Sequence, residues 1–216
     1  MKVKWLGHAS FLITSESGIK IITDPYPQGS GLSYIPLSSV SADIITMSHD
    51  HFDHNNISSV PGKPELVTGS GTKTAKGITF RGIATHHDAS QGKDRGNNTV
   101  FCFSVDEIKV CHLGDLGHRL NQEQIVEIGN VDVLFIPIGG VYTIDAKFAG
   151  TVVDDLKPQV AIPMHYKTEK CNWPLNTVDD FVAGKANVQR VNNSEMEFRA
   201  GKLPQNAEIV VLEPAS

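Results

Sequence analysis

The amino-acid sequence predicts a layered α/β or α+β sandwich, and two observations lead to this class. Short apolar runs separated by turn residues fill the first half of the chain, whereas strand-like and helix-like segments alternate in the second half. Several runs are apolar at consecutive residues, as in IITM, VLFIPI and VAIPM, which is typical of strands covered on both faces. This order fits a layered sandwich better than a barrel of eight identical βα units.

The predicted strands are apolar, β-branched runs that end at turn residues. They cover residues 3–14, 19–23, 44–47, 66–68, 78–85, 99–105 and 108–112 in the first half, and residues 131–138, 160–164, 188–191 and 209–212 in the second. Few helices fit between the strands of the first half. We therefore expect strands and hairpins first, followed by a β-α-β-α-β succession.

The first predicted helix covers residues 122–128. Asn121 is suited to its N-cap, Gln124 stands three residues later as in a capping box, and Gly129 is suited to its end. Another helix begins at Asn176 or Thr177 and carries apolar residues on one face. Both helix starts are therefore predicted from capping residues that lie next to them in the sequence.

A longer helix is expected between these two. Ala149, Val152, Val153 and Leu156 follow the i, i+3, i+4, i+7 spacing of one helix face. Thr143 or Asp145 is available as the cap, and Pro158 ends the segment.

The composition is typical of a single domain with a sizeable core. Of 216 residues, 40% are hydrophobic, and 19 Lys and Arg stand against 24 Asp and Glu, a net charge of −5. No composition shift or charge block marks a boundary, so we expect one domain over residues 1–216. The acidic balance and the lack of a Lys/Arg cluster argue against long nucleic acid as a partner.

The remaining composition points to a cytoplasmic protein. No apolar run approaches the ~20 residues of a membrane span, and the first ten residues lack the apolar stretch of a signal peptide. Cys102, Cys111 and Cys171 have no CxxC spacing, so we expect no disulfide framework. Cys102 and Cys111 lie in apolar runs, where buried, unreactive thiols are the favoured interpretation.

The most informative stretch is SHDHFDH, which follows the apolar run IITM and contains His49, His51, Asp53 and His54. In an extended segment, residues two apart project to the same side, so His49 and His51 can reach one ion. A turn then directs Asp53 and His54 to a second point. The alternative is a solvated polar loop, which we would favour for one histidine but not for four metal-type side chains.

Further ligand-type residues stand where other apolar strands end. Asp24, the neighbouring His86 and His87, Asp115 and His165 each follow a predicted strand. This arrangement gathers side chains at one edge of the sheets, where α/β architectures usually place their sites.

These residues carry a family resemblance. WLGHASFLI, TDPY, SHDHFDH, HHD, LGDLGH and PMHY occur along nearly the whole chain in the order typical of metallo-β-lactamase fold hydrolases. The chain most resembles the branch of ascorbate-6-phosphate lactonase-like and N-acylphosphatidylethanolamine phospholipase-like proteins. The resemblance implies a four-layer αβ/βα sandwich, with two mixed β-sheets packed face to face and helices outside.

The resemblance also implies a ligand set for two metal ions. His49, His51 and one histidine of the HHD segment hold one ion, while Asp53, His54 and His165 hold the other. Asp115 bridges the two ions. We favour His87 over His86, because neighbours on a strand face opposite ways and the resembling proteins place an aspartate after the ligand.

Imidazole and carboxylate ligands without a thiolate suit Zn²⁺, with Mn²⁺ or Fe²⁺ as options. We expect two Zn²⁺ per chain. A metal-bound water has its pKa lowered from ~15.7 toward ~7, so a hydroxide nucleophile exists at neutral pH. Asp53 is expected to orient this water and accept its proton, and Asp115 to complete the catalytic centre.

Four nearby residues have two interpretations each. Asp24 either fixes a ligand histidine through a hydrogen bond or is a turn residue before Pro25. His8 and His118, the latter a candidate catalytic residue, either contact substrate and donate a proton to the leaving group or are packed histidines. Lys167 either binds an anionic group of the substrate or is a surface lysine.

The leading functional prediction is hydrolysis of an ester, lactone or phosphoester bond in a small, anionic substrate. His51 stands where resembling diiron proteins place a carboxylate, which disfavours redox chemistry. A phosphodiesterase acting on a nucleotide or lipid head group is one alternative, and a non-catalytic metal-binding or sensing protein is another. Specificity is expected in the loops 26–41 and 89–98.

Overall fold

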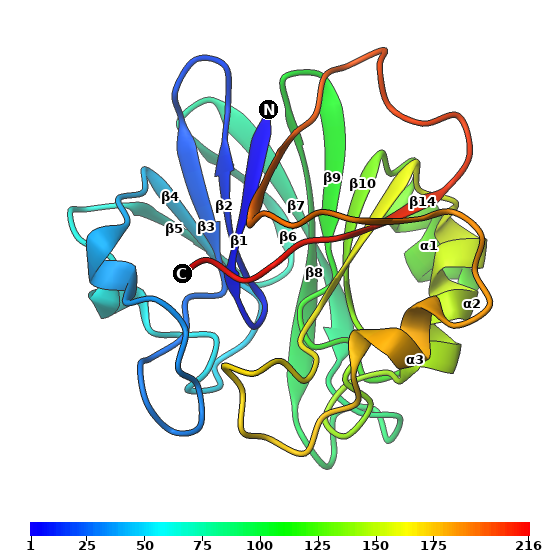
Figure 1. Ribbon diagram of the computed structural model, residues 1–216. Coiled ribbons are helices and arrows are strands. Elements are labelled where there is room, and N and C mark those ends of the chain that lie inside the picture. Colours follow the sequence, from blue (N-terminus) through cyan, green and yellow to red (C-terminus); the bar gives the residue numbers. More distant parts are fainter.

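The computed structural model describes residues 1–216 and contains two β-sheets that face each other (Figure 1). Both are mixed, with an antiparallel part and a parallel part. The first sheet has the order β13-β1-β2-β3-β4-β5 and the second the order β12-β14-β11-β10-β9-β8-β7-β6. This arrangement confirms the predicted sandwich of two mixed sheets.

The strands agree with most of the apolar runs, but residues 3–14, predicted as one strand, form two antiparallel strands with a turn at His8 and Ala9. The first sheet consists of β1 (Lys2–Gly7), β2 (Ser10–Thr14), β3 (Lys20–Thr23), β4 (Ile44–Met47), β5 (Glu65–Thr68) and β13 (Glu195–Glu197). The second consists of β6 (Gly71–Ala75), β7 (Ile78–His86), β8 (Asn97–Val105), β9 (Ile108–His112), β10 (Val133–Pro137), β11 (Val160–Met164), β12 (Val188–Arg190) and β14 (Glu208–Val211). Strands β6 and β13 were not predicted, because GTKTA and EME are too polar to be recognised as strands.

The consecutive apolar residues are explained by burial on both faces of the strands. In β3 and β4, Ile21 and Ile44 belong to a core of 44 buried residues that both sheets share. Their neighbours Ile22 and Ile45 belong to a separate cluster of 10 buried residues on the other face of the first sheet. The prediction of one domain stays a prediction, and a core shared by the sheets favours it.

The three α-helices start where the capping signals place them. Helix α1 (Gln122–Ile128) has the full capping box at Asn121, and α2 (Ala146–Leu156) has Asp145 as its N-cap. Helix α3 (Val178–Val182) follows Thr177, whose backbone N–H donates to Asp180. No helix combines the length and the apolar character that a membrane span requires.

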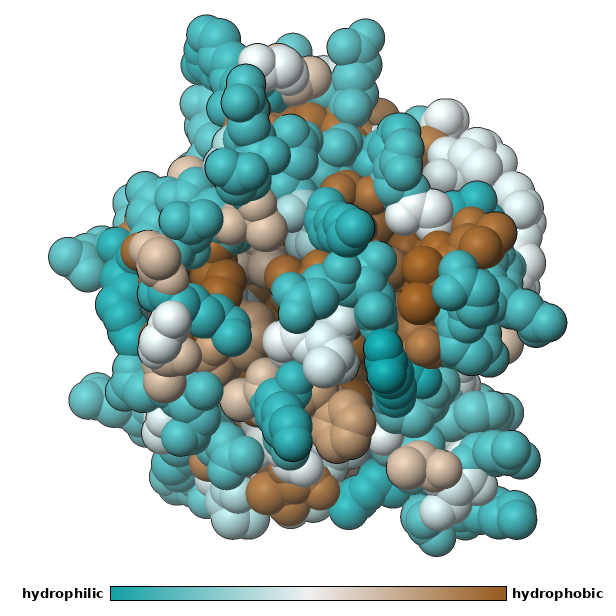
Figure 2. Space-filling model, turned by 90° about the vertical axis from the view of Figure 1, so that its right-hand side faces the viewer, coloured by the Kyte–Doolittle hydropathy of each residue, from teal (hydrophilic) through white to brown (hydrophobic).

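The outer layers differ between the two sheets. All three α-helices lie outside the second sheet, and the surface on their side is mainly hydrophilic with separate small hydrophobic patches (Figures 1 and 2). The outer face of the first sheet is covered mainly by residues 26–42 and 57–60, whose only helical parts are the short 3₁₀ helices Leu37–Ser39 and Ile57–Ser59. The predicted sandwich with helices outside is therefore confirmed, but the layer outside the first sheet has only these short helices, and loop residues such as Tyr26 and Tyr34 cover much of this face.

Strand direction brings the chemical residues together. Strands β1, β3 and β4 run in the same direction in the first sheet, and β7, β9 and β11 do so in the second. The polar residues follow the carboxyl ends of these six strands. They converge at one end of the sandwich, between the two sheets.

Candidate metal centre

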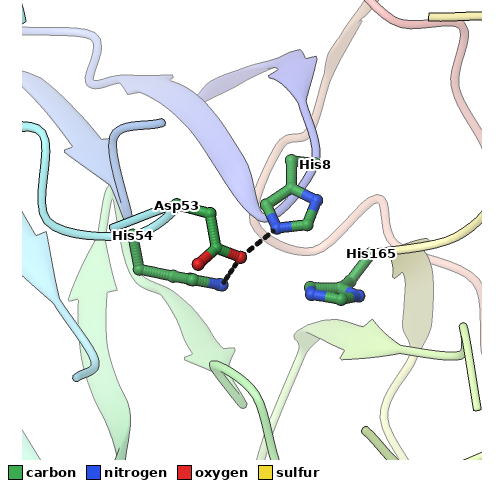
Figure 3. Close-up of side chains that lie close together, drawn as sticks. All are labelled: His8, Asp53, His54 and His165. Atoms are coloured by element: carbon green, nitrogen blue, oxygen red, sulfur yellow. Dashed lines mark hydrogen bonds and ion pairs between the residues drawn. The ribbon is translucent and has the colours of Figure 1, made fainter. Parts of the chain in front are cut away.

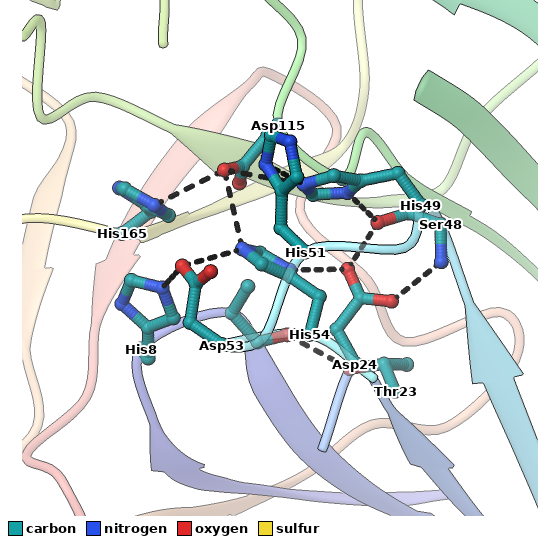
Figure 4. Close-up of polar contacts among 12 residues, drawn as sticks. His8, Thr23, Asp24, Ser48, His49, His51, Asp53, His54, Asp115 and His165 are labelled. Atoms are coloured by element: carbon teal, nitrogen blue, oxygen red, sulfur yellow. Dashed lines mark hydrogen bonds and ion pairs between the residues drawn. The ribbon is translucent and has the colours of Figure 1, made fainter. Parts of the chain in front are cut away.

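The loop after β4 supplies side chains to two neighbouring groups. Nε2 of His49 lies 3.1 Å from Nδ1 of His51, so the two imidazoles point to a common position. The backbone N–H of His54 donates to the carbonyl oxygen of His51 at 2.9 Å, which closes a turn. This turn directs Asp53 and His54 to a second position (Figure 4).

The first group consists of His49, His51 and His87, whose ligand-type atoms lie within 4.8 Å of one another. Its members come from opposite sheets, since His87 follows β7 and the other two follow β4. His86 is not part of this group or of any other. The geometry therefore favours His87 over its neighbour.

The second group consists of Asp53, His54, His165 and His8, again with ligand-type atoms within 4.8 Å of one another (Figure 3). His8 follows β1, and its Nε2 lies 2.9 Å from Oδ2 of Asp53. Because an ionised carboxylate only accepts, this contact makes His8 the donor. His8 thus holds the carboxylate of Asp53 in place.

Asp115 lies between the two groups. Its Oδ2 is 3.1 Å from Nε2 of His87, 3.1 Å from Nε2 of His54 and 3.2 Å from Nε2 of His165. The backbone N–H of Asp115 donates to Oδ1 of Asn98 at 3.0 Å, which positions the turn after β9. The structure therefore places Asp115 where a carboxylate would contact both groups.

Buried atoms without hydrogen-bond partners test whether these residues fit metal ions. Within the two groups and Asp115 they are Nε2 of His54, both ring nitrogens of His165, Nδ1 of His8, Nδ1 of His87 and Oδ1 of Asp115, and Nδ1 of His86 is unpartnered as well. Such groups are costly to bury unless something satisfies them. His54 and His165 approach the Asp115 carboxylate closely yet make no hydrogen bond to it. Imidazole and carboxylate atoms converging in this way fit divalent cations.

Asp24 and Ser48 orient two of the histidines. Nδ1–H of His54 donates to Oδ2 of Asp24 at 3.0 Å, so Nε2 faces the centre. The Ser48 hydroxyl donates to the same oxygen at 2.6 Å and accepts from Nδ1–H of His49 at 2.9 Å. Hydrogen bonds of this kind fix the tautomer of metal-binding histidines. Asp24 thus has the first of its two predicted geometries.

Backbone strain is concentrated at the same centre. His8, Asp24 and His165 have φ values of +53°, +38° and +52°. Residues other than glycine rarely adopt positive φ, and they persist there only when the surroundings impose it. These three residues therefore have unfavourable backbone conformations, and these conformations direct their side chains toward the centre.

The electrostatics of the cluster favour positive charge. Burial lowers the pKa of His49 to about 3 and that of His8 to about 4, so both imidazoles are neutral near pH 7. Burial also disfavours a charged His54, but the carboxylates of Asp115 and Asp53 outweigh it and raise the pKa of His54 well above its ordinary value. Burial acts to raise the pKa of Asp115, yet His165 and His54 hold it well below the ordinary value. The carboxylates therefore attract a cation to this position.

For His118 and Lys167, the contacts favour the second of their two interpretations, a packed histidine and a lysine outside the site. Nε2 of His118 accepts the backbone N–H of His86, and its Nδ1–H donates to the carbonyl of Arg119, so both nitrogens bind backbone groups. Lys167 donates to the carbonyl of Cys171. Neither side chain lines the pocket above the centre.

A pocket of about 410 Å³ opens onto the cluster. We call its metal-type residues the floor and its other side chains the rim. The floor residues that line the pocket are His51, Asp53, His87, Asp115 and His165, and the rim residues are Phe52, Arg95, Tyr142 and Trp173.

Sequence reasoning missed all four rim residues, and also the supporting Ser48 and Asn98. The prediction of specificity in loops 26–41 and 89–98 was the one signal that pointed toward the rim. Arg95 belongs to the second of these loops, and Ser30 of the first accepts a hydrogen bond from Trp173.

Comparisons with known proteins agree with this geometry. The sequence pattern of the beta-lactamase superfamily domain matches residues 2–165. A metal-dependent hydrolase of Carboxydothermus hydrogenoformans is 31% identical over 205 residues, which are 83% of this chain and 88% of that protein.

Solved structures extend the likeness over the whole fold. A Thermotoga maritima protein described as a Zn-dependent hydrolase of the metallo-β-lactamase superfamily is 38% identical, covers 98% of both chains and has a TM-score of 0.79. A metal-dependent hydrolase of Parabacteroides distasonis is 16% identical, with a TM-score of 0.68 over 98% of this chain and 92% of its own, and shows the shared fold alone. The chain belongs to the β-lactamase superfamily and is a metal-dependent hydrolase of that superfamily. The narrower resemblance to the lactonase-like and phospholipase-like branch stays a prediction.

Proposed function

We propose that this metal-dependent hydrolase cleaves an ester, lactone or phosphoester bond in a small anionic molecule, with water activated at a pair of metal ions. The observation that carries the proposal is the convergence of Nε2 of His54, His87 and His165, from both sheets, on Oδ2 of Asp115, with Nε2 of His54 and of His165 buried and without hydrogen-bond partners. A structural role alone would leave these atoms unsatisfied.

In this proposal, His49, His51 and His87 hold one ion, and Asp53, His54 and His165 hold the other. Asp115 lies between the two groups and serves both. When bound, such ions lower the pKa of water toward ~7 and polarise the bond to be cleaved, which supplies a nucleophile at neutral pH.

The side chains of the floor position the reaction. Burial acts to raise the pKa of Asp53, but His54 and His8 outweigh it and keep this carboxyl ionised. An ionised Asp53 at the edge of the pocket is able to accept the proton of the attacking water. His8 fixes the orientation of that carboxylate through its 2.9 Å hydrogen bond.

We propose Zn²⁺ as the metal. Nitrogen and oxygen ligands without a thiolate suit Zn²⁺, Mn²⁺ and Fe²⁺ alike. The description of the Thermotoga maritima protein as Zn-dependent favours zinc among them.

The proposed substrate is a small molecule, and a pocket of about 410 Å³ supports this size. The lactone and phosphoester options rest on the resemblance to the lactonase-like and phospholipase-like branch. We also propose a cytoplasmic location, because all three cysteines are free thiols, as is usual in a reducing compartment.

A substrate panel tests the proposal. The protein is loaded with Zn²⁺, Mn²⁺ or Fe²⁺ and assayed on chromogenic carboxylic esters, lactones, phosphomonoesters and phosphodiesters. We expect turnover of esters, lactones or phosphomonoesters that is lost on chelation and restored by metal. Turnover of phosphodiesters alone would replace the proposal with the phosphodiesterase alternative. No turnover of any substrate by protein with two bound ions would support the non-catalytic alternative.

A further inference from the structure

We infer that the substrate is an organic anion with a flat apolar body, whose anionic group pairs with Arg95 and whose body packs against Trp173. This inference rests on the proposed function, because it describes the molecule held above the same centre. Its evidence lies in the four rim residues, which take no part in the proposed ligation.

Arg95 is a cation without an acidic partner. It makes none of the ion pairs in the structure, and its guanidinium carbon lies 4.8 Å from the centroid of the Tyr142 ring. The planar guanidinium binds carboxylate and phosphate groups through paired hydrogen bonds. An unpaired arginine at the mouth of a pocket therefore favours an anionic ligand.

The loop that carries Arg95 is held in place by hydrogen bonds to the carboxylate of Asp88. The carboxylate of Asp88 accepts the backbone N–H groups of Ser90, Gly92, Asp94 and Arg95 at distances of 2.7 to 3.1 Å. These four hydrogen bonds hold residues 90–95 close to Asp88. Because Asp88 follows His87, the same segment reaches both the floor and the rim.

Trp173 is fixed next to Tyr142, the ring over which Arg95 lies. Its indole N–H donates to the carbonyl of Ser30 at 2.8 Å. Gly31, at φ +92°, allows this approach, since a Cβ there would lie 2.6 Å from the indole nitrogen. The half-buried ring is therefore pre-organised to stack on a ligand.

Two further aromatic side chains extend this surface. The Phe52 and Tyr142 rings lie 6.0 Å and 5.9 Å from the Trp173 ring. Phe52 is 53% exposed, although it stands between the floor residues His51 and Asp53. An apolar ligand would cover this surface, whereas a wholly polar ligand would leave it in water.

Charge and shape together define the substrate class. A neutral ligand would leave Arg95 unpaired, and a small hydrophilic ion would leave the three aromatic rings uncovered. A carboxylate or phosphate joined to an aryl group satisfies both requirements. The bond to be cleaved then lies between these contacts and the floor.

Binding of matched probes tests the inference apart from catalysis. The probes are 4-phenylbutyrate, the neutral 4-phenyl-1-butanol and the non-aromatic butyrate, and calorimetry on the metal-loaded protein measures their affinities. We expect 4-phenylbutyrate to bind about tenfold tighter than either analogue, since a charged hydrogen bond and a stacked ring each contribute about that factor. Quenching of Trp173 fluorescence would report the location, because Trp5 is buried.

Variants identify the groups responsible. Arg95→Met should weaken 4-phenylbutyrate about tenfold and leave the alcohol unchanged, and Trp173→Leu should weaken both aromatic probes. Lys93→Met removes an exposed cation from the same loop and should change neither affinity. If Arg95→Met keeps the full preference for the anion, the anionic group binds elsewhere and the inference is wrong.

The two proposals fail differently. Binding through Arg95 without turnover of any substrate would leave the inference standing and overturn the proposed hydrolysis. Turnover that is equal for neutral and anionic aryl esters, and unaffected by Arg95→Met, would overturn the inference and leave hydrolysis standing.

Discussion

The floor and the rim of the pocket differ in how deeply their side chains are buried and in whether strand ends or loops carry them. Floor residues such as His165 and Asp115 are each 1% exposed and follow strand ends, and Asn98 holds the backbone of Asp115. Rim residues lie on loops, and Phe52 is 53% exposed. The floor fixes the type of chemistry, because misplacement of a buried ligand is costly. The rim residues take no part in the proposed ligation, so we propose that they determine which substrate binds.

The largest effect is expected at the centre of the floor. Asp115→Asn removes the charge that serves both groups while keeping its size, so we expect loss of bound metal and about a 10³-fold fall in kcat/KM. The core does not change, and thermal unfolding should stay cooperative. Elemental analysis and kinetics measure these outcomes. Asp50→Asn, an exposed carboxylate of the SHDHFDH loop, is the matched control. Unchanged metal stoichiometry in Asp115→Asn would contradict its assignment.

Substitutions of the adjacent residues His86 and His87 are expected to differ most clearly after this, in bound metal and in kcat/KM. His87→Ala should release metal and lower kcat/KM by about 100-fold, since it removes one of three proposed ligands. His86→Ala should retain both ions, because His86 lies outside the cluster. Metal analysis of the two purified variants decides between them, and the opposite result would exchange their roles.

Substitution of Asp24, which orients His54 and Ser48 by hydrogen bonds, should have an intermediate effect on metal binding. Asp24→Asn replaces one oxygen that accepts from His54 and Ser48, and we expect metal affinity to fall about 10–100-fold. Asparagine tolerates the φ of +38° at this position, so the backbone should not change. Competition with a chelator measures the affinity. An unaltered affinity for metal would show that Asp24 acts only as a turn residue before Pro25.

A smaller effect is expected at Asp88, whose carboxylate holds the loop that carries Arg95. Asp88→Ala removes the acceptor for four backbone N–H groups, so loop 89–98 loosens around Arg95. We expect KM for an anionic aryl substrate to rise about fivefold with kcat nearly unchanged, as for a loss of uniform binding. Steady-state kinetics and metal analysis would test this. Loss of metal instead would show that Asp88 supports the floor.

The smallest effects are expected at His118 and Lys167. His118→Gln and Lys167→Met should leave kcat/KM within about twofold of the parent, because their polar atoms bind backbone groups outside the pocket. A tenfold loss at either position, with the fold intact, would restore the catalytic or anion-binding role that the motif suggested.

Local patterns predicted most of the fold. Helix α1 begins and ends at the predicted residues because Asn121 and Gln124 form a capping box within one turn. Strands β4, β9 and β11 also have their predicted bounds, since their apolar runs are buried. The thin layer outside the first sheet was not predictable, because residues 26–42 give no periodic signal and are held by scattered side chains such as Tyr26 and Leu37.

The sequence by itself determined the residues able to bind metal and the chemistry they favour, because SHDHFDH is contiguous and the other candidates follow apolar strands. Only the tertiary structure decided which side chains meet. It placed His87 rather than His86 in the cluster, set Asp115 between two groups, moved His118 and Lys167 away, and brought Arg95 and Trp173 to one rim. The physical reason is that strand ends are set by local hydrophobic patterns, whereas contacts between distant loops depend on how the two sheets pack.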